Sequence, residues 1–196
     1  MMRTLALLLL LLPGLARAQE FPALFDVTGV ASNDVLNVRA EPNASAEKIG
    51  ALAFDATDVE VIRRAGGWGL VNSGERSGWV SMRFLAAQQG GDYALSRLLT
   101  CFGTEPFWNL EITQGDLARF SAPNQGVAHY TVGLLQRSVN RTDRFVLLGG
   151  RLVAVISRTS CNDGMSDRNY GLAIDLLPDV ETGAALYSGC CSLTGN

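Results

Sequence analysis

Short runs of alternating apolar and polar residues fill the chain between residues 26 and 85. Their two-residue period predicts β-strands with one buried face. The clearest runs are residues 35–38, 59–62 and 69–71. They are separated by Glu41-Pro42-Asn43, Gly66-Gly67 and Asn72-Ser73-Gly74, residue types that favour turns. Several short, closely spaced strands predict a small β-barrel in this half of the chain.

The alternation stops at residues 86–92, which are rich in Gly and Gln, and returns after Cys101. We interpret the interruption as a linker. The later strand-like runs are residues 107–113, 128–135, 144–148, 152–157, 170–177 and 185–188. Because no long run has a helical period, the second half is predicted to be a β-barrel or sandwich. The expected fold class is therefore all-β, with a small N-terminal barrel and a C-terminal β-barrel stabilised by disulfides.

The first 18 residues have the three zones of a secretory signal peptide: Arg3, an apolar run at residues 5–12, and Ala16-Arg17-Ala18. The apolar run is shorter than the ~20 residues that span a bilayer. Cleavage is expected after Ala18, where no cysteine follows to carry a lipid. We therefore expect a periplasmic or secreted protein without a transmembrane anchor. Its predicted parts are a signal peptide (1–18), a first domain (19–86), a linker (87–97) and a second domain (98–196).

The charge balance argues against two classes of partner. Removing residues 1–18 leaves 14 of the 16 basic residues against 19 acidic ones, a net charge of −5. An acidic chain with scattered arginines gives no electrostatic reason to bind nucleic acid or an anionic membrane.

All four cysteines lie in the second half of the chain, at Cys101, Cys161, Cys190 and Cys191. In an exported protein, two disulfides are the expected state. A bond between the neighbours Cys190 and Cys191 would usually be strained. We therefore expect Cys161 to pair with Cys190 or Cys191, and the sequence leaves open which of the two it is.

The first half carries an ordered set of motifs: Leu36-Asn37-Val38-Arg39, Ile49-Gly50-Ala51-Leu52, Gly67-Trp68-Gly69-Leu70-Val71, Gly78-Trp79-Val80 and Phe84-Leu85. Together they make residues 26–86 resemble the bacterial SH3 (SH3b) family. The resemblance implies a small barrel that binds cell-wall peptides or targets a neighbouring domain to the wall.

Three side chains of this half are candidates for ligand binding. Trp68 and Trp79 can offer faces on which an extended peptide stacks. The alternative, which we favour, is that both tryptophans close the barrel core. Arg39 can receive a carboxylate, but a structural hydrogen bond across the following turn is the preferred interpretation.

The second half contains Gly103-Thr104-Glu105-Pro106-Phe107-Trp108, residues 161–170 (CNDGMSDRNY) and Gly189-Cys190-Cys191. With these strings, residues 98–192 resemble a family of uncharacterised exported bacterial domains, similar to the small barrels of META-type and lysozyme-inhibitor proteins. The resemblance implies a fold but no reaction.

Four residues of these strings are candidate ligand-binding residues: Glu105, Trp108, Asp163 and Arg168. If Phe107 and Trp108 belong to one strand, they face opposite sides, so one of them can close the barrel. We favour a structural role in which Glu105 caps a turn or pairs with an arginine such as Arg168. The loop after Cys161 lacks the ligand spacing of an EF-hand, so calcium is not expected there. We expect no other metal and no cofactor.

Catalysis by a thiol would require His129, the single histidine, to act as base for Cys101 or Cys161. Neither cysteine precedes a helical pattern, and one histidine does not make an open zinc site. We therefore predict a non-enzymatic binding protein whose partner is peptidoglycan or an envelope protein. The alternatives are a lysozyme-inhibitor-like protein, or a cell-wall hydrolase that pairs Glu105 with Asp163 or Asp167.

Overall fold

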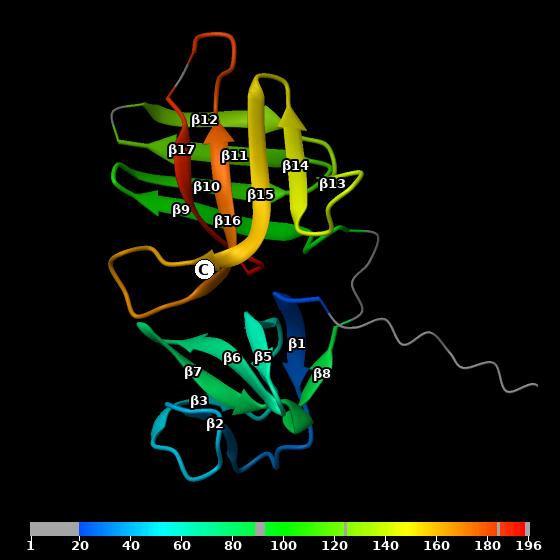
Figure 1. Cartoon of the computed structure of the whole chain (residues 1–196), viewed down its shortest axis with the longest axis vertical. Coiled ribbons are helices and arrows are strands. Elements are labelled where there is room, and N and C mark those ends of the chain that lie inside the picture. Colours follow the sequence, from blue (N-terminus) through cyan, green and yellow to red (C-terminus); the bar gives the residue numbers. More distant parts are fainter. Residues whose placement is uncertain (1–19, 89–92, 124, 184, 195–196) are drawn as a thin grey trace, which may run out of the picture.

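The computed structural model describes residues 20–88, 93–123, 125–183 and 185–194, which form two β-structured bodies one above the other (Figure 1). We call residues 20–88 the N-terminal barrel and residues 93–194 the C-terminal barrel. The predicted signal peptide and the middle of the predicted linker lie outside the described residues. No helix in the described part of the chain is long and apolar enough to cross a membrane. The all-β prediction is confirmed.

The N-terminal barrel consists of two small antiparallel sheets, ordered β4-β1-β8 and β3-β2-β7-β6-β5. Its elements are β1 (Ala23–Val27), β2 (Val35–Arg39), β3 (Lys48–Ala53), β4 (Val59–Val61), β5 (Arg63–Ala65), β6 (Trp68–Ser73), β7 (Arg76–Ser81), the 3-10 turn η1 (Met82–Phe84) and β8 (Leu85–Ala87). The predicted strands at 35–38, 59–62 and 69–71 correspond to β2, β4 and β6. Their inward residues, including the fully buried Val38 and Val61, make one core between the sheets.

The C-terminal barrel is a single nine-stranded antiparallel sheet that curls into a half-barrel, in the order β12-β11-β10-β9-β17-β16-β15-β14-β13 (Figure 1). Its strands are β9 (Leu98–Thr104), β10 (Phe107–Thr113), β11 (Leu117–Ala122), β12 (Gly126–Thr131), β13 (Gln136–Arg137), β14 (Arg144–Gly149), β15 (Leu152–Cys161), β16 (Tyr170–Leu177) and β17 (Tyr187–Ser192). Near its two edges, the backbone N–H of Gly133 donates to the carbonyl of Leu148 (3.2 Å), which draws the curled sheet together at one end.

Alternation explains which C-terminal strands were predicted correctly. The runs 107–113 and 170–177 coincide with β10 and β16, whose residues such as Leu110 and Ile174 point into the core. The run predicted at 128–135 was wrong at its end, because β12 stops at Thr131. Val132 and Leu135 are buried where the chain crosses toward β13. The run at 185–188 was also misplaced, since the strand there, β17, spans Tyr187–Ser192.

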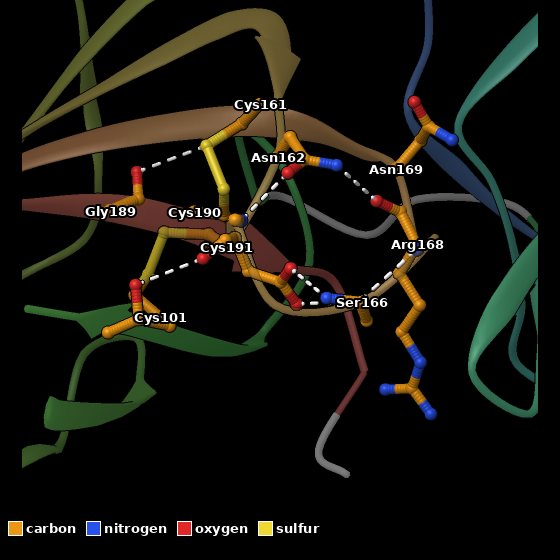
Figure 2. Close-up of a disulfide and its surroundings, with 12 residues drawn as sticks. Cys101, Cys161, Asn162, Ser166, Arg168, Asn169, Gly189, Cys190 and Cys191 are labelled. Atoms are coloured by element: carbon orange, nitrogen blue, oxygen red, sulfur yellow. Dashed lines mark hydrogen bonds between the residues drawn. A yellow bond between two sulfur atoms is a disulfide. The ribbon is translucent and has the colours of Figure 1, made fainter.

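Two disulfides tie β17 to its surroundings, and they confirm the expected pairing (Figure 2). Cys161, at the end of β15, bonds to Cys190, and Cys101 of β9 bonds to Cys191. Neighbouring residues of a strand point to opposite faces, so Cys190 and Cys191 reach different partners. The Cys101–Cys191 bond belongs to the barrel core.

Both ends of the predicted linker make ordered contacts. Gln88 donates its backbone N–H to Leu24 and its side-chain amide to Asp26 (2.7 Å). At the other end, Ala94 and Leu95 pack against the core of the C-terminal barrel. The connection is therefore anchored on each side of the residues that the structure does not describe.

Candidate functional site

A groove of about 380 Å³ lies on the N-terminal barrel, beside the first residue of β6. Its lining includes Asp34, Asn37, Arg39, Trp68, Arg83 and Phe84. The groove therefore has an aromatic wall and charges of both signs, which are properties of sites for small polar ligands or peptides.

Trp68 and Arg39 reach the groove because of where their strands begin and end. Trp68 follows the Gly66-Gly67 turn, where Gly66 has a positive φ of 57°, and remains only partly buried. Arg39 ends β2 and donates its Nη1 to the carbonyl of Ala46 (2.7 Å), across the loop between β2 and β3. That bond is the structural contact favoured for Arg39 in the sequence analysis. It uses one of the five N–H donors of the guanidinium.

Of the groove residues named above, Asp34, Asn37, Arg83 and Phe84 were not predicted as site residues. The Arg83 guanidinium lies 4.4 Å from the centroid of the Phe84 ring, a cation–π contact that holds the charge at the rim. Asp34 precedes β2, where its carboxylate accepts the backbone N–H of Val35 (2.8 Å). In the sequence, Arg83 and Phe84 are neighbours that follow shortly after the Gly78-Trp79-Val80 motif. A basic residue beside an aromatic one was the signal from which this part of the site could have been predicted.

Trp79 lies apart from this groove. Its side chain is 8% exposed and packs with Ile62 and Leu70 in a small separate cluster. The Arg63 guanidinium covers it at 4.7 Å from the ring centroid. Trp68 also packs against this cluster, so the two tryptophans share one apolar cluster, but of the two it is Trp68 that lines the groove.

The loop at residues 162–169, which we call the docking loop, is organised by its own side chains (Figure 2). Asn162 donates to the carbonyl of Arg168 (3.1 Å) and accepts the backbone N–H of Gly164 (2.7 Å). Asp163 accepts the backbone N–H groups of Met165 and Ser166 and the Ser166 hydroxyl. Burial alone would raise the pKa of Asp163, but the hydrogen bonds from Ser166 and Met165 outweigh it and leave the pKa below its usual value.

The docking loop attaches the C-terminal barrel to the β6–β7 hairpin of the N-terminal barrel. Asn72 donates its side-chain amide to the carbonyl of Asn169 (3.0 Å), and Ser77 accepts the backbone N–H of Asn169 (2.8 Å). Ser77 and Asp167 are also joined by a backbone hydrogen bond of 3.1 Å. The hydrogen bonds of candidate residue Asp163 stay within the C-terminal barrel, whereas candidate residue Arg168 reaches the N-terminal barrel.

Arg168 does not pair with Glu105, as had been suggested for that carboxylate. Its Nε donates to the carbonyl of Gly74 (2.7 Å), and its Nη2 lies 4.0 Å from Glu75. Both partners are at the tip of the β6–β7 hairpin. Arg168 lies near Glu75 and not near Glu105 because the contact between the barrels brings the tip of this hairpin to the docking loop.

Glu105 and Trp108 occupy opposite environments although they are close in sequence. Glu105 is exposed in the turn between β9 and β10. Trp108 is buried and packs edge-on against Tyr187 at 6.0 Å between ring centroids. Phe107 is 57% exposed, which confirms that it faces away from Trp108. The hydroxyl of Thr104 donates to the carbonyl of Asp163 (3.0 Å), so this turn supports the docking loop.

A second contact between the barrels centres on Glu60, which the sequence analysis did not single out. Its Oε2 accepts the hydroxyl of Ser192 and the backbone N–H of Leu193 (3.1 Å). Its Oε1 is buried with no hydrogen-bond partner among the described residues. Burial raises the pKa of Glu60 to about 7, although the bonds from Ser192 and Leu193 act in the opposite direction.

The four cysteines and His129 were the residues considered for catalysis by a thiol. Each of the four cysteines is in a disulfide, so no thiol is available beside His129, which is exposed on the edge strand β12. Within the described ranges, no group of three or more His, Cys, Asp and Glu side chains is placed to hold a metal ion.

Comparison with known families identifies part of the N-terminal barrel. Residues 34–86 match the bacterial SH3 domain family, so this segment is a bacterial SH3 domain. The match starts after β1, which the structure adds as the strand between β4 and β8. No curated protein and no solved structure matches the chain. The resemblance suggested for residues 98–192 stays a prediction.

Proposed function

We propose that the protein is exported and that its bacterial SH3 domain binds the peptides of cell-wall peptidoglycan through the groove beside Trp68. The observation that carries the proposal is the position of this groove within the matched segment, where Trp68, Arg39 and Arg83 line one concave surface. An indole face provides contact area for a peptide, while arginines recognise carboxylates, which the peptides of peptidoglycan carry.

Two other features support export to the cell envelope. The first 18 residues have the composition of a signal peptide. The two disulfides are typical of proteins outside the reducing cytoplasm. We assign the C-terminal barrel no reaction and propose that it is a non-enzymatic partner of the SH3 domain.

The test is co-sedimentation of the purified protein with insoluble peptidoglycan. We expect the wild type to sediment and Trp68→Ala to bind roughly tenfold more weakly or worse, because removing a central aromatic anchor is typically costly. Phe107→Ala is the matched control, since Phe107 is an exposed aromatic residue of the C-terminal barrel. It should bind like the wild type. The proposal fails if the wild type does not sediment, or if both variants bind equally.

A further inference from the structure

The end of β17 is held on the N-terminal barrel by hydrogen bonds to one carboxyl group, beside the packing of Leu24 against the C-terminal core. Ser192 and Leu193 are buried, at 5% and 3% exposure, and both donate hydrogen bonds to the Oε2 of Glu60 on β4. A cleft of about 300 Å³ between the barrels is lined by Glu60 on one side and by Arg168 and Tyr170 on the other. The Glu60 contact therefore closes one margin of the space between the barrels.

The protonation of Glu60 matters because its other oxygen has nothing to bind. Oε1 is buried without a hydrogen-bond partner among the described residues. A carboxylate whose charge is buried and unpaired is unfavourable, whereas the neutral acid is tolerated far better. Two donors at Oε2 offset only part of that penalty, because burial is the larger effect on the pKa.

No charged neighbour changes this balance. The ionisable groups around the cleft are Asp58 just before β4, Asp26 on β1, and Arg168 and Tyr170 opposite. The amide of Gln88 bonds to both Asp58 (3.0 Å) and Asp26 (2.7 Å). None of the four is among the causes that shift the pKa of Glu60, which are burial, Ser192 and Leu193.

We propose that Glu60 is a proton-controlled latch between the two barrels: its neutral form holds the end of β17, and ionisation releases it. The docking loop contributes a separate contact through Asn72, Ser77 and Asn169, none of which titrates. Release of the latch therefore loosens the β17 side of the cleft, while the docking loop and the ion pair between Glu20 and Arg158 still join the barrels. This inference does not depend on the peptide-binding proposal.

The direction of the pH effect follows from the raised pKa. When β17 detaches, Glu60 meets water and its pKa returns to 4.5 from about 7. The latch is fully effective below pH 4.5, weakens as the pH rises, and reaches its weakest state above pH 7. For these two pKa values, the equilibrium constant for release should rise by about 70-fold between pH 5 and pH 8.

Amide hydrogen exchange of the full-length protein tests this directly at Leu193, whose N–H is part of the latch. After correction for intrinsic exchange, its protection factor should fall by about 70-fold from pH 5 to pH 8. Protection of the Asn169 amide, in the docking-loop contact, should change far less. Equal protection of Leu193 at both pH values would overturn the proposal.

Three variants identify the group responsible. Glu60→Gln cannot ionise, so protection of Leu193 should become independent of pH. Ser192→Ala removes a donor that lowers the pKa of Glu60, so the midpoint of the change should move to higher pH, even if Glu60→Gln does not fold. Asp58→Asn alters the neighbouring acid of the cleft and should leave the midpoint where it is. An unchanged midpoint in Ser192→Ala, or loss of the pH effect in Asp58→Asn, would contradict the latch.

Discussion

At the scale of single residues, Trp108 shows how a bulky buried side chain requires glycine at the positions that pack against it. A Cβ atom built on Gly103 would lie 2.2 Å from the indole Nε1, and one on Gly189 would lie 2.0 Å from the carbonyl oxygen of Phe102. Both distances are far inside van der Waals contact. The glycines of the Gly103 and Gly189 motifs are therefore explained by the close approach of β9, β10 and β17 around this tryptophan.

We expect Gly189→Ala to destabilise the protein by about 1–3 kcal/mol or more, because the methyl group meets backbone atoms that have no room to move. Urea unfolding followed by fluorescence measures the loss. Gly133→Ala is the control, since a Cβ there meets nothing within 4 Å. Equal unfolding midpoints for the two variants would show that the strands can separate at little cost.

At the scale of elements, the two disulfides constrain chain segments of different length. Cys101–Cys191 spans 90 residues and Cys161–Cys190 spans 29. By restricting the unfolded chain, loops of these lengths stabilise the folded protein by about 4.5 and about 3.5 kcal/mol. The first bond is also part of the core, where truncation leaves a cavity. We expect the Cys101→Ala/Cys191→Ala pair to lower the unfolding free energy more than Cys161→Ala/Cys190→Ala.

Denaturant unfolding of the two double variants measures this order. The reverse order would mean that organising the docking loop, which begins directly after Cys161, contributes more to stability than the longer constraint does.

The two-residue alternation of apolar and polar residues predicted strands well where one face of the strand is exposed to solvent and the other is buried. β10 alternates along its whole length and was predicted to the residue. β9 was not, because Leu99, Thr100 and Cys101 are consecutive buried residues between β10 and β17, so its sequence does not alternate. The two-residue period is lost whenever both faces of a strand are covered.

Part of the candidate site, like part of the fold, could be predicted from the sequence. Trp68 and Arg39 were found because family motifs contain them. Glu60 was missed because Val59-Glu60-Val61 looks like an ordinary strand with its polar residue in solvent. The outward face of β4 meets the end of β17, and that contact depends on how the two barrels are arranged, which no local pattern encodes.

At the scale of the whole molecule, the docking loop makes the two barrels depend on each other. Asn72 is central to the contact: it donates to the carbonyl of Asn169 and accepts the hydroxyl of Ser77 (2.6 Å). A buried or half-buried hydrogen bond contributes about 1 kcal/mol, and partners left unsatisfied add to the loss. Removing this side chain should therefore weaken the attachment without touching either core.

We expect Asn72→Ala to lower the temperature at which the N-terminal barrel unfolds and to separate its transition from that of the C-terminal barrel, because the bond to Asn169 is one of those that couple them. Calorimetry of the full-length protein records both transitions. Asn43→Ala is the matched control, since among the described residues the Asn43 side chain bonds to Glu41 and Ser45 of its own turn. If both variants unfold alike, the Asn72 bonds do not contribute to the coupling of the two barrels.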